Sequence, residues 1–177
     1  MRKIIIIIFF LFLSSIIYAL TWEIKTDIGI RIELNDVTKD YNFLNQMIGK
    51  NYEYVEVEIY NGNPIIDFYF FPPGSKALFI NKNEETFKHK DIYFEFVNKL
   101  SGEEITQYQN IIDKLGAIKL GYRESGTILL AFGNTFNFSN AEVFKIEFGT
   151  GLYIEYYEEE NRVKIIDEYN KLNLEEE

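Results

Sequence analysis

The sequence predicts a β-rich α+β fold, either an antiparallel β-sandwich or a small β-barrel of about nine or ten strands with one helix over residues 101–115. Three observations support this: an alternating N-terminal segment, many short apolar runs separated by turn residues, and one capped helical stripe. A chain of 177 residues without internal repeats or linkers favours a single domain.

The alternating segment runs from Trp22 to Leu34. Six of its seven even positions are apolar, and five of its six odd positions are charged. A period of two places alternate side chains on opposite faces, so we expect a half-buried strand or a bent pair of strands. Gly29 marks a bulge or a sharp bend. Because purely parallel sheets bury both faces, the alternation favours an antiparallel sheet.

A short helix or turn is expected over residues 36–49, ending at Gly49. Strand-like runs follow it, separated by turn residues such as Asn61–Pro64 and Pro72–Gly74. A polar loop or hairpin is expected between residues 80 and 92. The predicted strands are Tyr52–Tyr60, Ile65–Phe71, Ala77–Ile80 and Ile92–Val97.

The helix over residues 101–115 has a clear beginning and end. Ser101 and Glu104 have the spacing of a capping box. Gly116 is expected to end the helix in the left-handed conformation. Between these two ends, apolar residues at three- and four-residue spacing form one stripe: Ile105, Tyr108, Ile111, Ile112 and Leu115.

Strands resume after this helix. Ile118–Tyr122 and Thr127–Phe132 flank a turn and predict a hairpin, and Glu142–Phe148 and Leu152–Tyr157 predict a second hairpin around residues 149–151. The run Arg162–Tyr169 is compatible with a strand or a helix. The last residues, 175–177, are all Glu and are expected to form a frayed acidic tail.

Residues 1–19 have the layout of a secretory signal peptide. Arg2 and Lys3 precede the apolar run Ile4–Leu13, and Ala19 is a small residue at the expected cleavage site. The alternative is a retained membrane anchor over Ile4–Leu20. The expectation is therefore a bacterial protein that is periplasmic or extracellular, with one domain over residues 20–177 and no stable membrane span after cleavage.

The composition excludes several classes of function. The chain has 28 acidic and 18 basic residues, a net charge of −10, and no Cys. Without residues 1–19 the net charge is −12, because Arg2 and Lys3 are lost and no acidic residue is. Such a charge argues against a nucleic-acid partner. The absence of Cys excludes disulfides, thiolate zinc sites and a Cys nucleophile.

No motif predicts a cofactor or a metal ion. His89 is the only histidine, lies between Lys88 and Lys90, and is expected in an exposed loop or an edge strand. A zinc site needs several His or Cys ligands. Gly149–Gly151 lacks the residues of a phosphate-binding loop and is expected to be a turn. Glu158–Glu160 is expected to be a solvated turn.

One pair of carboxylates is a possible catalytic pair. Glu56 and Glu58 share a face of the predicted strand and lie about 6–7 Å apart on it, a separation compatible with inverting glycosidases. Such pairs also arise on ordinary solvated strands. An exported carboxylate-dependent hydrolase therefore stays an alternative, and it requires a carboxyl group whose pKa is raised in an apolar pocket.

Tyrosines alternate with carboxylates on two predicted strands. Tyr52 and Tyr54 share a face with Glu56, and Tyr153 and Tyr157 share one with Glu155. Such faces can bind a glycan or a protein partner. Cross-strand pairing that stabilises a sheet is the favoured explanation, because large aromatic residues are common in strands.

The leading hypothesis is a non-enzymatic binding or surface-interaction module without catalytic, cofactor or metal residues and with an unknown protein or glycan partner. An eight-stranded outer-membrane barrel is a weaker alternative, because the capped helix interrupts the strands.

Overall fold

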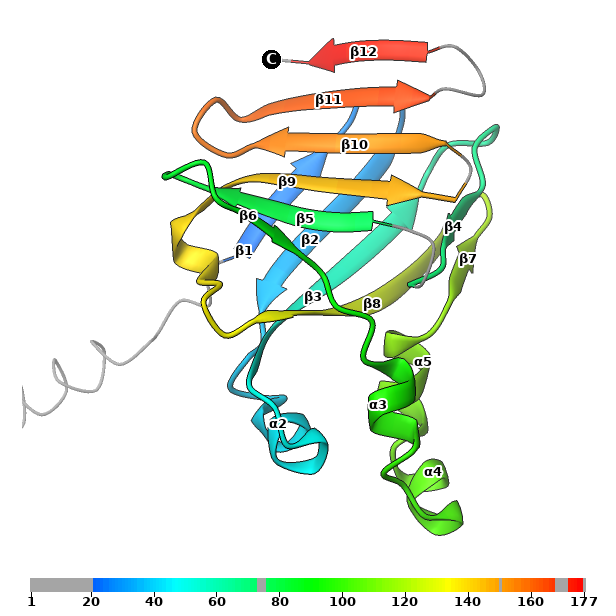
Figure 1. Cartoon of the computed structure of the whole chain (residues 1–177). Helices are drawn as coiled ribbons and strands as arrows, with labels where there is room; N and C mark the ends of the chain where they lie inside the picture. The colour runs from blue at the N-terminus through cyan, green and yellow to red at the C-terminus, as the bar shows by residue number, and fades with distance from the viewer. Residues whose placement is uncertain (1–20, 73–75, 150, 168–171, 177) are drawn as a thin grey trace, which may run out of the picture.

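The computed structural model describes residues 21–72, 76–149, 151–167 and 172–176 (Figure 1). The predicted signal peptide, residues 1–19, lies outside the described residues. The elements follow one another as β1 (Thr21–Lys25), β2 (Ile30–Asp36), α2 (Asn42–Ile48), β3 (Tyr52–Asn61), β4 (Phe68–Phe70), β5 (Lys76–Asn81), β6 (Thr86–Lys88), α3 (Tyr93–Val97), α4 (Gly102–Gln107), α5 (Gln109–Leu115), β7 (Ile118–Leu120), β8 (Glu124–Gly133), a 3₁₀ turn (Phe138–Asn140), β9 (Ala141–Phe148), β10 (Leu152–Tyr157), β11 (Arg162–Asp167) and β12 (Leu172–Glu176).

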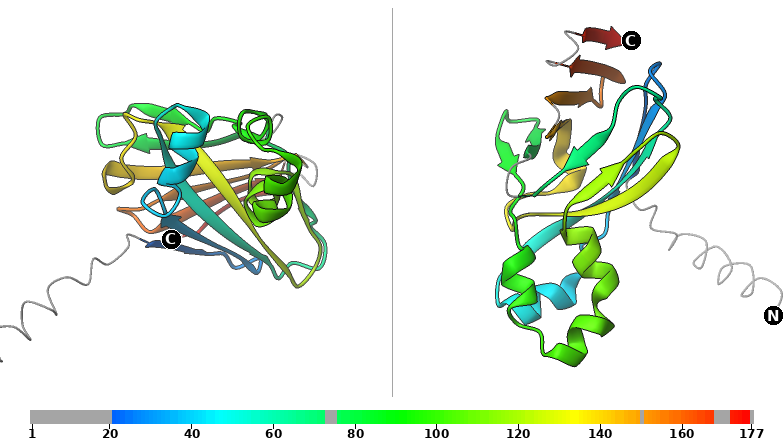
Figure 2. Two further views of the ribbon diagram at one scale, coloured as in Figure 1. Left: turned by 90° about the horizontal axis from the view of Figure 1, so that it is seen from below. Right: turned by 90° about the vertical axis from the view of Figure 1, so that its right-hand side faces the viewer.

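Two antiparallel sheets face each other in a sandwich-like arrangement (Figures 1 and 2). The four-stranded sheet has the order β1-β2-β3-β8, and the six-stranded sheet has the order β12-β11-β10-β9-β5-β6. A two-stranded ribbon, β4-β7, lies at one side of the sandwich. The described strands thus form open sheets and not a closed barrel, and there are more of them than the nine or ten predicted.

The core between the sheets follows from the alternation of the strands. Trp22 and Ile24 of β1, with Ile32 of β2, point inward and are almost fully buried, as the sequence predicts. Gly29, at φ +85°, turns the chain between these strands, so the segment is a bent pair. Phe79 of β5 lies at the aromatic centre of the core. Its ring contacts those of Trp22, Phe132, Phe136, Phe138 and Phe144.

The helices cover one end of the outer face of the four-stranded sheet (Figure 2). They bury Tyr54 of β3 with Leu129 and Ala131 of β8 in a second apolar cluster. The cluster takes its helical side chains from α2, α3 and α5: Leu44, Ile48, Phe96, Ile112 and Leu115.

Asn61, at the end of β3, joins the β4–β7 ribbon to the four-stranded sheet. It is fully buried, and its Nδ2 donates to the carbonyl oxygens of Ile66 (2.6 Å) and Leu120 (3.3 Å). Next to it, the chain passes so close to Gly29 that a Cβ on Gly62 would lie 2.5 Å from the Gly29 carbonyl oxygen. This corner therefore requires glycine at position 62 and an amide at position 61.

The run Ile92–Val97 forms helix α3 instead of the predicted strand. Asp91 Oδ1 accepts a hydrogen bond from the Tyr93 N–H (3.1 Å) and begins the helix. Ile92 and Phe96, four residues apart, are buried, whereas Phe94 is 64% exposed. A strand would have placed all three on one face. The prediction of a strand is wrong because the periodicity of this apolar run is ambiguous.

The predicted helix over residues 101–115 is divided into α4 and α5 at Tyr108. The capping box is present, because Ser101 Oγ accepts from the Glu104 N–H and Glu104 accepts from the Ser101 N–H. The bend directs the first turn away from the core and leaves Ile105 37% exposed. Gly116 is extended, at φ −85°, and not left-handed as predicted.

The predicted hairpin of Ile118–Tyr122 with Thr127–Phe132 is wrong. β7 pairs with β4, and β8 pairs with β3 along its whole length. The hairpin of β9 with β10 is confirmed, although residue 150 of its turn lies outside the described residues. Residues 162–167 form a strand, and residues 172–176 pair with it as β12 instead of fraying.

No helix in the described part of the chain is both long enough and apolar enough to cross a membrane.

His89 lies in the segment that passes from the six-stranded to the four-stranded sheet. Its backbone N–H donates to the Ala77 carbonyl (2.9 Å), and the next residue pairs with Ala131 of β8. Its ring lies 5.8 Å from that of Phe70, and its Nε2 is buried without a hydrogen-bond partner among the described residues. His89 thus continues the edge strand β6, one of the two places expected for it, but it is partly buried and not exposed, because the segment crosses to the other sheet.

This burial predicts a pH-dependent stability. Burial lowers the pKa of His89, against an opposing effect of Asp91 and with a further lowering by Lys90. The unfolded chain therefore binds more protons than the native chain below about pH 6.5, and the free energy of unfolding falls as the pH falls. Between about pH 7 and about pH 5.5, we expect the urea midpoint to fall less in His89→Leu than in the parent protein. Equal pH dependence in the two proteins would contradict this.

Candidate functional site

The tyrosine face of β3 is divided into a covered and an open part. Tyr54 is fully buried under the helices, and its hydroxyl donates to Asn45 Oδ1 (2.9 Å). Tyr52 is half-buried beside α3, where its hydroxyl donates to Glu95 Oε2 (3.5 Å). These two tyrosines, candidates for a binding surface in the sequence, belong to the packing of the helices on the sheet.

Glu56 marks the boundary between the two parts. Its Oε2 accepts from Lys114 Nζ of α5 (2.5 Å) and from the Tyr41 hydroxyl (3.1 Å). Burial lowers the pKa of Lys114, but hydrogen bonds to Glu56 and Tyr41 outweigh it and leave this pKa above its usual value. The ion pair is thus intact at neutral pH and fixes α5 to β3. Glu56 is engaged in it, whereas Glu58 is exposed beyond the helices.

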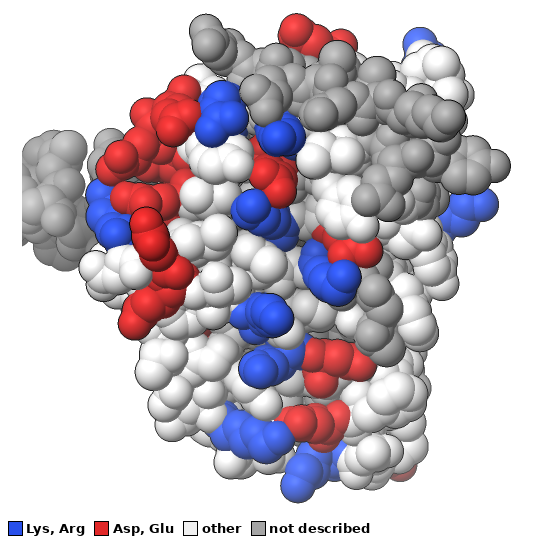
Figure 3. Space-filling view, turned by 45° about the horizontal axis from the view of Figure 1, so that its top comes forward, with Lys and Arg blue, Asp and Glu red and all other residues white. Residues whose placement is uncertain are grey.

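The second tyrosine face lies on β10, on the outer face of the six-stranded sheet. The Tyr157 hydroxyl donates to Glu155 (2.9 Å), which also accepts from Lys145 Nζ (3.0 Å). Burial raises the pKa of Glu155, but these two hydrogen bonds outweigh it and hold this pKa below its usual value. The Tyr153 hydroxyl donates to Glu147 (3.3 Å). Lys and Arg run through the middle of this side with acidic residues beside them (Figure 3), so its charges are largely paired.

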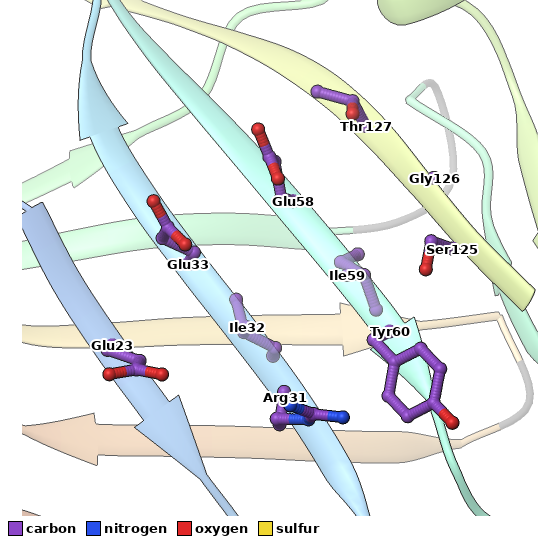
Figure 4. A pocket seen from close by; sticks show the side chains of 10 residues that line it. All are labelled: Glu23, Arg31, Ile32, Glu33, Glu58, Ile59, Tyr60, Ser125, Gly126 and Thr127. Atoms are coloured by element: carbon purple, nitrogen blue, oxygen red, sulfur yellow. The ribbon is translucent and has the colours of Figure 1, made fainter. Parts of the chain in front are cut away.

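A hollow of about 430 Å³ lies on the open part of the four-stranded sheet. We call it the glutamate groove. Strands β1, β2, β3 and β8 form its floor (Figure 4), and no residue of a described helix lines it. Its charged and hydroxyl-bearing lining residues are Glu23, Arg31, Glu33, Glu58, Tyr60, Ser125 and Thr127.

Three carboxylates form one row across the groove. Glu23 lies opposite Glu33, and Glu33 lies opposite Glu58, in the register of β1, β2 and β3 (Figure 4). Like charges directly opposite each other on neighbouring strands destabilise a sheet. Partners compensate only part of the row. Glu23 pairs with Lys25 (2.8 Å), Glu33 accepts from Asn35 Nδ2 (3.1 Å), and Glu58 has no hydrogen-bond or ion-pair partner among the described side chains.

A second row closes one side of the groove. The guanidinium of Arg31 lies 4.7 Å from the centre of the Tyr60 ring, and Ser125 lies opposite Tyr60 on β8. The cation therefore covers one face of Tyr60, the only aromatic ring among the described residues that line the groove. Chemically, the site offers a line of hydrogen-bond acceptors with negative charge, together with the hydroxyl groups of Ser125 and Thr127.

A carboxylate-dependent hydrolase requires a carboxyl group in an apolar pocket. Glu56 and Glu58 give this requirement no support, because Glu56 is held in an ion pair and Glu58 is open to solvent. In the described ranges, no group of three or more His, Cys, Asp or Glu side chains has an arrangement that could hold a metal ion. Comparison of the chain with protein-family models, curated proteins and solved structures finds no match.

Sequence reasoning missed the groove although it found the residues. Glu23, Arg31 and Glu33 are among the charged odd positions of the first alternating segment. Only the pairing of β1, β2 and β3 places them beside Glu58, and strand order is not readable from alternation. The hint in the sequence was that two of the predicted strands carry Glu on their polar faces.

The row of carboxylates predicts that a mutation will stabilise the protein. Glu33 is its central member, so Glu33→Gln removes two like-charge contacts and keeps an acceptor for Asn35. We expect the free energy of unfolding to rise by a few tenths of a kcal/mol at low ionic strength, with less gain in high salt. Urea denaturation measures this. Glu159→Gln, which removes a carboxylate paired with Lys82 (3.2 Å), is the control and should bring no gain. A destabilised Glu33→Gln would contradict the prediction.

Proposed function

We propose that the protein is an exported, non-enzymatic binding module that holds a basic segment of a partner protein in the glutamate groove. The observation that carries this proposal is the in-register row Glu23, Glu33 and Glu58 on an uncovered sheet face. Like charges directly opposite each other are expected to weaken the sheet, so the fold gives no reason for this row. Local features that reduce stability without a structural gain are expected at functional positions.

The charge of the groove favours a cationic ligand. A Lys or Arg side chain placed between two of the carboxylates would relieve the repulsion within the row and form charge-assisted hydrogen bonds. The net charge of −10 acts in the same direction, because it attracts basic partners over a distance.

The shape of the groove favours a polypeptide over a sugar. Sugar rings stack on open aromatic faces, but Arg31 covers one face of Tyr60. The groove is a wide, polar depression without the apolar walls that enclose small molecules. An extended segment whose alternate side chains are basic could lie in it with all its cations facing the floor.

Binding is tested with a fluorescein-labelled peptide of alternating Lys and Ser and the purified protein at low ionic strength. We expect saturable binding that weakens as salt is added. Glu33→Gln and Glu58→Gln should each weaken it severalfold. Glu103→Gln, on α4 at the helical end of the molecule, makes the same change of charge outside the groove and should have little effect.

Two results would overturn the proposal. One is the absence of saturable binding at low salt. The other is an equal effect of Glu33→Gln and Glu103→Gln, which would mean that only net charge matters. Tyr157→Ala tests the opposite sheet face, and a loss of binding in this variant alone would move the site there.

The proposed export has its own test. Cleavage after Ala19 would make Leu20 the first residue of the mature protein. We expect N-terminal sequencing or intact mass of the protein recovered from the cell envelope or medium to give this residue. Recovery only in the cytoplasm, with residues 1–19 attached, would contradict export.

A further inference from the structure

The four-stranded sheet ends in β1, and this edge of the sheet is open. β1 is the outermost strand and pairs with β2 over five residues in unbroken register (Figures 1 and 4). The opposite edge, β8, is partly covered. There the Lys90 N–H donates to the Ala131 carbonyl (2.7 Å). The Ile118 side chain of β7 also lies so close to Gly126 that a Cβ on this glycine would clash with it.

The hydrogen bonds at the end of β1 show which backbone groups face the open edge. The Thr26 N–H donates to the Ile30 carbonyl (3.0 Å), so Thr26 directs its backbone toward β2. Successive residues of an antiparallel strand direct their backbone groups to alternate sides. Ile24 therefore also faces β2, whereas Glu23 and Lys25 direct their N–H and C=O groups outward. Among the described residues, no backbone group bonds to them from the open side.

The edge of β1 has few of the features that normally block a sheet edge. Such edges are blocked by Pro, a bulge, an inward-pointing charge, an edge Lys or a covering segment. The residues Thr21–Lys25 include no Pro and no bulge, and their inward side chains are the buried Trp22 and Ile24. The one blocking charge is Lys25, which lies at the last position of the strand and pairs with Glu23 (2.8 Å). An added strand can therefore pair with this edge.

The row of carboxylates in the glutamate groove ends at the same edge. Glu23, its first member, combines an outward-facing backbone with a side chain that lines the groove and is 58% exposed. A residue paired with Glu23 from outside would place its own side chain on the groove face, at the end of the row. A Lys or Arg there would form an opposite-charge pair with Glu23 and extend toward Glu33. The charge of the groove thus identifies the occupant of the edge.

We infer that the basic segment of the partner protein binds as a fifth strand, antiparallel to β1, with a Lys or Arg opposite Glu23. This inference rests on the proposed function and states how the segment is held. An antiparallel pair is slightly more stable per residue than a parallel one. Opposite Lys25, two residues before the basic one, the segment carries an acidic or hydroxyl residue, because a like charge would repel.

The two kinds of residue in such a segment differ in where their backbone points. A basic residue opposite Glu23 exchanges two hydrogen bonds with it, because its N–H donates to the Glu23 carbonyl and its carbonyl accepts from the Glu23 N–H. The residues between the basic ones direct their N–H groups away from the sheet. N-methylation of the peptide backbone therefore blocks pairing at the first kind of position and not at the second, and it leaves every charge in place.

A fluorescein-labelled peptide of Glu-Ser followed by the Lys-Ser repeat tests this pairing in three forms. The first is unmethylated, the second is N-methylated at Glu and every Lys, and the third is N-methylated at every Ser. We expect the second form to bind about tenfold or more weakly than the first, because several backbone hydrogen bonds are lost together. The third form has the same charge and a similar number of methyl groups, and it should bind about as well as the first.

The position of each carboxylate along the row gives a second measurement. Each further strand adds about 4.8 Å to the distance from the edge, so Glu23→Gln should weaken binding most, Glu33→Gln less and Glu58→Gln least. All three side chains are exposed, and a urea midpoint verifies that the variants are folded. Glu103→Gln is again the control for net charge.

The outcomes separate this inference from the proposed function. Equal effects of the two methylation patterns, a larger effect of methylation at Ser, or a weakening that is largest in Glu58→Gln would overturn the edge assignment. Saturable binding of the Lys-Ser repeat would still support the groove in each of these cases. Failure of the unmethylated Lys-Ser repeat to bind would instead overturn the proposed function and this inference with it.

Discussion

The antiparallel pairing of β3 with β8, ten residues long, is the interaction on which the rest of the structure depends. One face of this pair forms the centre of the sandwich core, where Val57 and Leu130 are buried. Its other face carries the helices at one end and the glutamate groove at the other. Because one stretch of backbone supports both ends, the ion pair of Glu56 with Lys114 can mark a sharp boundary between them. The helices cover the apolar residues and leave the charged ones open.

Charged side chains are arranged differently on the outer faces of the two sheets. On the six-stranded sheet, acidic side chains such as Glu155 accept hydrogen bonds from neighbouring cations and tyrosines, and they stabilise the sheet. On the four-stranded sheet, Glu33 lies between two other glutamates, and the cations Lys25 and Arg31 occupy the next row. The same residue types are thus expected to contribute to stability on one face and to reduce it on the other. Composition alone, with its excess of acidic residues, does not distinguish the two arrangements.

Local signals in the sequence were reliable where one interaction decides the structure. The capping box of Ser101 and the alternation around Trp22 required no knowledge of distant contacts, and both predictions are confirmed. Predictions failed where the structure of a segment depends on the distant part of the chain that it packs against or pairs with. Ile92–Val97 suits a strand equally well, but Ile92 and Phe96 are buried in the cluster formed with the other helices. Residues 118–120 pair with β4 and not with β8, the next strand in the sequence. The groove and the buried His89 were not predictable for the same reason, since both arise from contacts between segments distant in sequence.

The buried amide at the end of β3 has a consequence for the chemical lifetime of the protein. Asn61 precedes Gly62, and in an Asn-Gly sequence the following backbone nitrogen can attack the side-chain amide and expel ammonia. Water then opens the resulting cyclic imide to a carboxylate. In the folded chain this nitrogen donates to the Gly29 carbonyl (3.0 Å), and the Asn61 amide is held by two carbonyl oxygens. Both reacting groups are therefore held by other hydrogen bonds in the folded chain. Deamidation would need this corner to open, and the resulting carboxylate would face the carbonyl groups of Ile66 and Leu120 and could not be buried again. The rate of deamidation at Asn61 is thus coupled to local unfolding of this corner.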